Sequence, residues 1–122
     1  MPPARLCLHV LQRLSLVIAP VLLAGCLPHP PPPPAPYHAA GANGAWHLVI
    51  DDKHVTFLPA GGQPIRQPKP AVIVGVAGEI YQTPRINVNI VHAQCALGDS
   101  GIYPDRVQVS VDGRPHEGCG GL

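Results

Sequence analysis

Charged side chains are scarce in this chain of 122 residues, since Asp, Glu, Lys and Arg together make up 12% of it. The formal net charge is +1, and no block of like charges appears. Proteins that bind nucleic acid through its phosphates carry a basic patch or stripe. The sequence therefore predicts no nucleic-acid partner.

Apolar runs as long as a membrane span are also missing. The longest one near the start, "LSLVIAPVLLA" at 14–24, is much shorter than the about 20 residues that a transmembrane helix needs. A secretory signal needs a positive leader, an apolar region of about 7–15 residues and small residues before the cut. With Arg5 and Arg13 in the leader, residues 1–25 match a signal peptide.

The signal ends in Leu23-Ala24-Gly25-Cys26, which resembles the lipobox of bacterial lipoproteins. In that family the signal is cut just before the cysteine, whose thiol receives a diacylglycerol and whose new amino group is acylated. The resemblance implies that Cys26 carries lipid, palmitate included, and becomes the first residue of the mature chain. Several acyl chains anchor a protein stably to a membrane.

The residue after the cysteine is Leu27. In Gram-negative lipoproteins an Asp at this place resembles a signal for retention in the inner membrane. The resemblance therefore implies the outer membrane, with the domain facing the periplasm. The alternatives are an uncleaved anchor and an ordinary signal that a cysteine happens to follow.

Proline is abundant, and much of it lies in "PHPPPPPAP" at 28–36. Such a segment adopts polyproline II, which at about 3.1 Å per residue spans roughly 28 Å. We interpret 26–43 as a proline-rich linker that holds a domain off the membrane. A ligand for a proline-binding domain is the alternative.

Residues 44–122 are expected to form one small domain made of strands. Alternation of apolar and polar residues predicts strands, which lie at 45–50, 54–58, 85–92 and 106–111. The first two form a hairpin in this prediction. Asp112-Gly113 predicts a type I′ turn, after which 114–119 returns as a short edge strand.

Two further segments complete the predicted domain. "AVIVGVA" at 71–77 is a continuous apolar run, consistent with a strand that is buried on both faces. Proline and glycine mark 59–70 as a loop. Five or six short strands predict an all-β fold, a small antiparallel barrel or sandwich.

The cysteines indicate a disulfide. Cys7 leaves with the signal and Cys26 carries lipid, so Cys95 and Cys119 remain as a pair in an oxidising compartment. A disulfide that closes a loop of this length contributes about 2–4 kcal/mol to stability. Small domains with a modest core often need such a staple.

A zinc site is the alternative for the same cysteines. "HAQC" at 92–95 and "HEGC" at 116–119 are both His-x-x-Cys, and two such pairs supply the ligands of a Cys₂His₂ site. Residues three apart on a strand point to opposite faces, so each pair would need a turn or bulge. The disulfide is our preferred interpretation, without a metal or other cofactor, and it leaves His92 and His116 as ordinary strand-end residues.

Catalytic motifs are lacking. Asp99, Ser100 and His92 carry the groups of a hydrolase, but the chain has no Gly-x-Ser-x-Gly elbow and no glycine-rich oxyanion loop. We therefore predict that the protein is not an enzyme.

A pattern of residues runs through the predicted domain: Trp-x-Leu-x-Ile, then Cys, Asp, Ser-Gly, Tyr-Pro, a Val-x-Val strand, Asp-Gly and a closing Gly-Cys. The residues that form it are Trp46, Leu48, Ile50, Cys95, Asp99, Ser100, Gly101, Tyr103, Pro104, Val107, Val109, Asp112, Gly113, Gly118 and Cys119. In this pattern the domain resembles a family of uncharacterised small bacterial lipoproteins and membrane proteins. The loop at 99 is shorter than in the family and has Asp99 where Met is common. The resemblance implies an envelope-anchored β-domain and no known activity.

Two loops, 59–70 and 96–105, are expected to face an envelope partner, with Asp99, Ser100 and Tyr103 as the candidate interaction residues. Ser100-Gly101-Ile102-Tyr103 is also similar to the Ser-Gly-x-x-Tyr loop of membrane-bound lysozyme inhibitors, although one residue short. The expected function is thus a membrane-anchored structural or interaction lipoprotein. An inhibitor and a metal-binding module are the alternatives.

Overall fold

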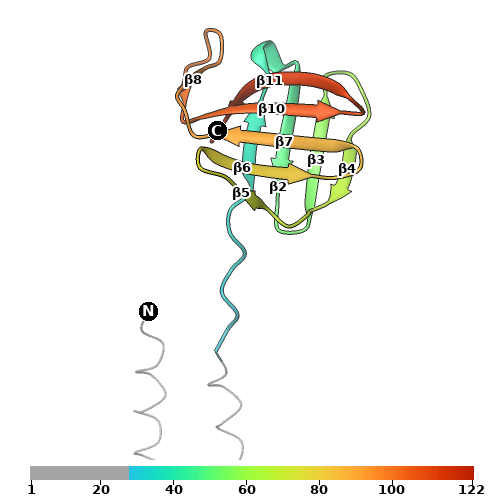
Figure 1. Ribbon diagram of the computed structural model, residues 1–122, viewed down its shortest axis with the longest axis vertical. Helices are drawn as coiled ribbons and strands as arrows, with labels where there is room; N and C mark the ends of the chain where they lie inside the picture. Colours follow the sequence, from blue (N-terminus) through green and yellow to red (C-terminus); the bar gives the residue numbers. More distant parts are fainter. Residues whose placement is uncertain (1–27) are drawn as a thin grey trace, which may run out of the picture. The chain divides into compact units, whose positions relative to one another are not determined.

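The computed structural model describes residues 28–122, so Cys26 and the signal region lie outside the described residues. Residues 28–36 form no strand or helix. The compact unit spans Pro33–Leu122, and nearly all of its regular secondary structure is β-strand (Figure 1). Nowhere in 28–122 is there a helix with the length and apolarity that crossing a membrane would take.

Nine strands form one antiparallel sheet in the order β4-β3-β2-β1-β11-β10-β7-β6-β5. Their bounds are β1 Tyr37–Ala40, β2 Trp46–Ile50, β3 His54–Pro59, β4 Ile65–Pro68, β5 Ile73–Val74, β6 Gly78–Gln82, β7 Ile86–Val91, β10 Asp105–Val111 and β11 Arg114–Gly120. A second, two-stranded sheet pairs β8 (Cys95–Ala96) with β9 (Ile102–Tyr103). A short 3₁₀ turn at Ala42–Gly44 joins β1 to β2.

The sheet curls into a half-barrel. In Figure 1 the strands β2, β3 and β4 lie behind β11, β10, β7 and β6 and cross them steeply. The core between the two layers is made of alternate residues from both, such as Leu48 and Phe57 from one and Val88 and Val109 from the other. Each of these strands is therefore apolar on the inner face and polar on the outer face.

The predicted all-β antiparallel fold is confirmed, and so are several of its details. The hairpin of β2 and β3 forms as expected. Ile86, Val88 and Ile90 of β7 point into the core, as their alternation with Asn87 and Asn89 predicted. Asp112 and Gly113 both have positive φ, at 48° and 81°, as a type I′ turn requires.

The sheet begins before residue 44, the boundary that the sequence suggested. Tyr37–Ala40, expected to be linker, is the interior strand β1, paired with β2 on one side and β11 on the other. Because β1 covers it, β11 is not the edge strand that was predicted. The predicted loop at 59–70 likewise contains a strand, β4.

The prediction of a doubly buried strand at 71–77 is wrong. This segment provides only the two-residue edge strand β5, which pairs with β6 alone. The side chains of Val72, Ile73, Val74 and Val76 are exposed. A continuous apolar run describes a buried strand only where other elements cover both of its faces, and here the sheet ends.

Gly78, at the start of β6, allows the backbones of β6 and β7 to approach each other closely. A Cβ at this position would collide with the carbonyl oxygen of Ile90, which cannot move without disturbing the pairing of the two strands. We expect Gly78→Ala to lower the free energy of unfolding by about 1–3 kcal/mol. Urea unfolding followed by the fluorescence of the buried Trp46 measures this change.

Gly75 provides the matched control for that prediction. It lies in the same β5–β6 connection, and a Cβ there meets only an ordinary contact at 3.5 Å. Gly75→Ala should therefore leave stability nearly unchanged. Equal losses in the two variants would contradict the role assigned to Gly78.

Candidate functional site

The predicted disulfide between Cys95 and Cys119 is present, with 5.6 Å between the two Cα atoms. Cys119 lies in β11, opposite Arg106 of β10 and Ala40 of β1. Arg106 and Ala40 face away from the main core, and so does Cys119. The bond thus fastens the segment containing Cys95 to the outer surface of the half-barrel.

Residues 93–104, which we call the arm, contain the β8–β9 hairpin and cover this outer surface. Ala40, Leu97 and Cys119 form a second, small apolar cluster there, against which Cys95 and Tyr103 pack. Cys119 is completely inaccessible to solvent although it points away from the main core. The disulfide and this cluster together hold the arm in place.

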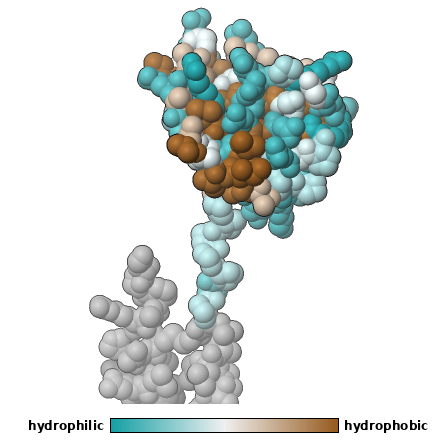
Figure 2. Space-filling view, viewed as in Figure 1, coloured by the Kyte–Doolittle hydropathy of each residue, from teal (hydrophilic) through white to brown (hydrophobic). Residues whose placement is uncertain are grey.

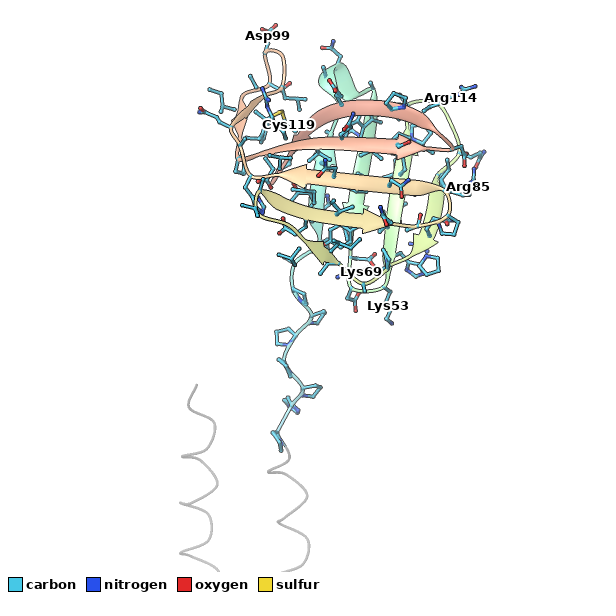
Figure 3. All side chains as sticks on the ribbon, in the orientation of Figure 1. Lys53, Lys69, Arg85, Asp99, Arg114 and Cys119 are labelled. Carbon is cyan, nitrogen blue, oxygen red and sulfur yellow. A yellow bond between two sulfur atoms is a disulfide. The ribbon has the colours of Figure 1, made fainter. Side chains whose placement is uncertain are left out.

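The three candidate interaction residues, which the sequence analysis assigned to the loop 96–105, all lie on the arm. The Tyr103 hydroxyl donates a hydrogen bond to the Ser100 carbonyl oxygen at 3.1 Å. The Ser100 amide donates to the Leu97 carbonyl oxygen at 2.9 Å. Asp99 is exposed at the tip (Figure 3). The hairpin therefore presents Asp99 and Ser100 on an internally bonded loop, while the ring of Tyr103 supports it.

A groove of about 470 Å³ lies between the arm and the outer face of β7, β10 and β11. Its lining combines polar side chains of the sheet with the inner side of the arm. The lining residues are Ala42, Asn89, Val91, Cys95, Ala96, Leu97, Arg106, Val107, Gln108, Glu117, Gly118 and Cys119. Arg106 and Glu117 give the groove one charge of each sign, so it can contact both an anionic and a cationic group of a ligand.

A separate polar cluster lies where β7 ends. His92 Nδ1 is 2.7 Å from Asp105 Oδ1, and His92 Nε2 is 2.6 Å from Glu79 Oε2. The Tyr37 hydroxyl donates to the other oxygen of Asp105 at 2.8 Å. These four side chains tie β1, β6, β10 and the end of β7 together.

Glu79 provides a second carboxylate for the imidazole of His92. Its Oε2 atom is buried and lies beside His92 Nε2. The hydrogen bond to Asp105 raises the pKa of His92 above its usual value, and the charge of Glu79 adds to this effect. Burial raises the pKa of Tyr37, and its hydrogen bond to Asp105 adds to the shift.

This pKa shift predicts a pH dependence of stability. Because the pKa of His92 is raised in the folded state, its stabilising effect is complete below its ordinary pKa of about 6.5 and is lost as the pH rises through the folded-state value. The melting temperature of the wild type should therefore exceed that of His92→Gln at pH 6 by more than at pH 9. A difference that is the same at both pH values would contradict the ion pairing of His92.

The two histidines of the His-x-x-Cys pairs contact groups other than the cysteine sulfur atoms. His92 contacts Asp105 and Glu79, and the His116 ring lies 5.0 Å from the Phe57 ring and 6.4 Å from the Trp46 ring. Both thiols are consumed by the disulfide. Over residues 28–122, no three His, Cys, Asp or Glu side chains are grouped so that they could hold a metal ion. The arrangement gives no support to the zinc alternative.

The polar cluster was missed from the sequence, because its residues are far apart along the chain and form no motif. Strand pairing brings them together: Gly78 pairs with Val91, and Val91 pairs with Arg106. A correct register between the three strands is the signal that could have revealed it. The imidazole of His92, at the end of β7, contacts carboxylates from β6 and β10. The cluster therefore links these three strands through their side chains.

We compared the chain with known protein families, curated proteins and solved structures. No family model, no curated protein and no solved structure matches the chain significantly.

Proposed function

We propose that this protein is a lipid-anchored protein of the bacterial envelope whose domain binds another envelope protein through the arm and the groove beneath it. The observation that carries the proposal is the arm itself. It presents an exposed loop with Asp99 and Ser100, and a disulfide keeps it on the outer face of the half-barrel. A rigid loop on a scaffold is a common design for recognition.

The disulfide also supports the proposed location. Disulfides form and persist in oxidising compartments such as the periplasm. The signal and lipobox pattern at 1–26 leads to the same compartment, at the outer membrane. The described residues contain no free thiol. The binding role is proposed in preference to catalysis, because the histidine of the hydrolase set is engaged by Asp105 and Glu79.

Site-specific photo-crosslinking in the native envelope tests the binding role. A photoreactive amino acid at Asp99 should yield a discrete crosslinked band, whereas the same residue at Arg114, exposed at a turn far along the sheet, should not (Figure 3). Arg106→Glu should weaken the Asp99 band, because it removes the positive charge of the groove. Equal bands from both positions would contradict a partner at the arm.

Inhibition of a lysozyme is the second candidate, favoured by the exposed position of Ser100 on the hairpin tip. An assay of lysozyme activity with residues 27–122 tests it directly. Inhibition that is lost in Ser100→Ala would support this candidate. Full lysozyme activity at a large excess of the domain would exclude the lysozyme used.

A further inference from the structure

Exposed apolar side chains gather in one segment of the domain. Four of the seven large apolar side chains that are exposed in residues 28–122 belong to it. They are Val72, Ile73, Val74 and Val76, and we call them the apolar tip. Val74 is 75% exposed, and Val76 is completely exposed. Figure 2 shows brown surface gathered at the lower edge of the domain, where Figure 1 places β5. Apolar surface of this kind marks a contact with a protein or a membrane.

Strand register places the apolar tip at the end of the half-barrel where the linker enters. Gly78 of β6 pairs with Val91 of β7, which pairs with Arg106 of β10. The neighbouring Asp105 accepts the hydrogen bond of Tyr37, the first residue of β1. The turn after β5 and the entry of the chain at Tyr37 therefore share one end, which we call the tether end. The arm also leaves the sheet here, after Val91, but its tip at Asp99 lies on the opposite side of the domain (Figure 3).

Two lysines flank the apolar tip at this end. The Lys69 amide donates to the Lys53 carbonyl oxygen at 2.8 Å, and Figure 3 shows both side chains at the bottom of the domain, opposite Asp99. The carboxylate of Asp51 accepts two backbone hydrogen bonds in the same turn, and Asp52 is exposed. The charges around the tip are thus mixed, and they give no strong attraction to a surface of either sign.

We propose that the apolar tip inserts into the interfacial region of the bilayer that carries the lipid on Cys26. This proposal rests on the lipid anchor of the proposed function. Only ten residues, 27–36, separate Cys26 from Tyr37, and a polyproline II rod of that length spans roughly 31 Å. When the rod lies along the membrane, the tether end reaches the surface, and insertion of the tip favours this orientation over an upright one.

A lipid surface suits the tip better than a second copy of the chain. A standard protein interface uses about 20–30 residues on each side, whereas the tip has four aliphatic side chains. The edge strand β5 offers only two residues for pairing and is bounded by Pro70 and Gly75. Amphipathic helices at membrane surfaces bury their apolar faces about 5–10 Å into the boundary between headgroups and acyl chains, and exposed aliphatic side chains such as those of the tip fit the same region.

Fluorescence quenching by brominated phosphatidylcholine tests the insertion. Chain purified from membranes is reconstituted into vesicles as Val76→Trp, with Ile102→Trp as the matched control, since Ile102 is an exposed apolar residue on the arm. Trp46 is buried and contributes the same background to both. Brominated lipid should remove at least half of the fluorescence added at residue 76 and little of that added at residue 102. Equal fluorescence with and without bromine at residue 76 would overturn the proposal.

A change of salt concentration distinguishes apolar insertion from electrostatic attraction of Lys53 and Lys69 to the membrane. Apolar burial is not screened by salt, so quenching at residue 76 should persist in 0.5 M NaCl. Loss of quenching in salt would overturn insertion in favour of electrostatic binding. A blue shift at residue 76 without quenching, together with a dimer in sedimentation, would overturn it in favour of a second copy.

A chemically attached lipid makes this test independent of the proposed function. In a chain that begins at Cys26 and has the Cys95–Cys119 disulfide, Cys26 is the remaining thiol, so it can be coupled to a maleimide lipid in the vesicle. Within the described residues, all strands, both apolar clusters and the disulfide lie at 37–122. Missing acylation in the mass of the cellular protein would refute the anchor, whereas missing quenching in the coupled vesicles would refute the apolar tip.

Discussion

Cys119→Ala should lower the free energy of unfolding by about 2–5 kcal/mol and leave much of the domain unfolded at 37 °C. The disulfide links residues 24 positions apart, so its loss frees a loop in the unfolded chain. It also removes buried contacts, because Cys119 is completely inaccessible and packs with Ala40 and Leu97. Total stabilities of small domains are only about 5–15 kcal/mol, so such a loss is large.

Thermal unfolding of the wild type and of Cys119→Ala, with and without reductant, measures this effect. Reductant should lower the melting temperature of the wild type toward that of the variant and leave the variant unchanged. Thiol counting on denatured, unreduced chain without Cys26 provides the direct control. Two free thiols in the wild type would refute the disulfide, and rescue of the variant by zinc would favour the metal-binding alternative.

The structure also predicts which part of the domain should unfold first in Cys119→Ala. The main core contains neither cysteine, whereas the second cluster under the arm contains Cys119 and Cys95 packs against it. Hydrogen exchange should therefore become fast first in the arm of Cys119→Ala, ahead of β7 and β10. In the proposed function the arm carries the binding loop, so the Asp99 crosslink should disappear before the domain unfolds.

The strands that the sequence predicted best are those with one face in the core. In β7 the alternation of Ile86, Val88 and Ile90 with two asparagines records directly which face is buried. β10 behaves in the same way. The pattern is strong there because polar residues cannot be buried without partners, and the outer face of these strands is accessible to solvent.

β1 could not be predicted because its four residues have no such pattern. "YHAA" follows a proline block and contains two alanines, which are poor strand formers. Its place inside the sheet comes from tertiary contacts. A Cβ at Gly118 of β11 would collide with the carbonyl oxygen of Ala40, so β1 lies unusually close to its neighbour. Small residues on both strands make this approach possible, and the sequence does not show which segments meet.

The candidate site also has a part that the local sequence indicates and a part that depends on tertiary structure. Cys95, Asp99, Ser100 and Tyr103 lie in one stretch of sequence on the arm, and the disulfide joins this stretch to Cys119 of β11. The polar cluster and the groove depend on how β6, β7, β10 and β11 pair, which no local pattern specifies. The apolar tip was predicted as buried, because hydrophobicity alone does not say what covers a segment.

Cys26→Ser should abolish both lipidation and cleavage of the protein. Diacylglycerol transfer requires the thiol of the cysteine after "LLAG", and serine does not supply it. The expected product is unprocessed precursor that incorporates no palmitate, because in lipoproteins the cut follows lipidation. Metabolic labelling with palmitate and the mass of the chain from each fraction measure both steps.

Cys7→Ser is the matched control, since Cys7 lies within the predicted signal and far from the lipobox. This variant should be labelled, cut and fractionated like the wild type. Palmitate in the Cys26→Ser chain would contradict lipidation of Cys26. Normal cleavage without palmitate in the wild type would instead indicate an ordinary secretory signal. In that case the linker would have no anchor, and the apolar tip would have to hold the domain at a membrane alone. Four aliphatic side chains are a weak attachment for that purpose, just as a single acyl chain is only marginal, so the unlipidated domain should be released by washing.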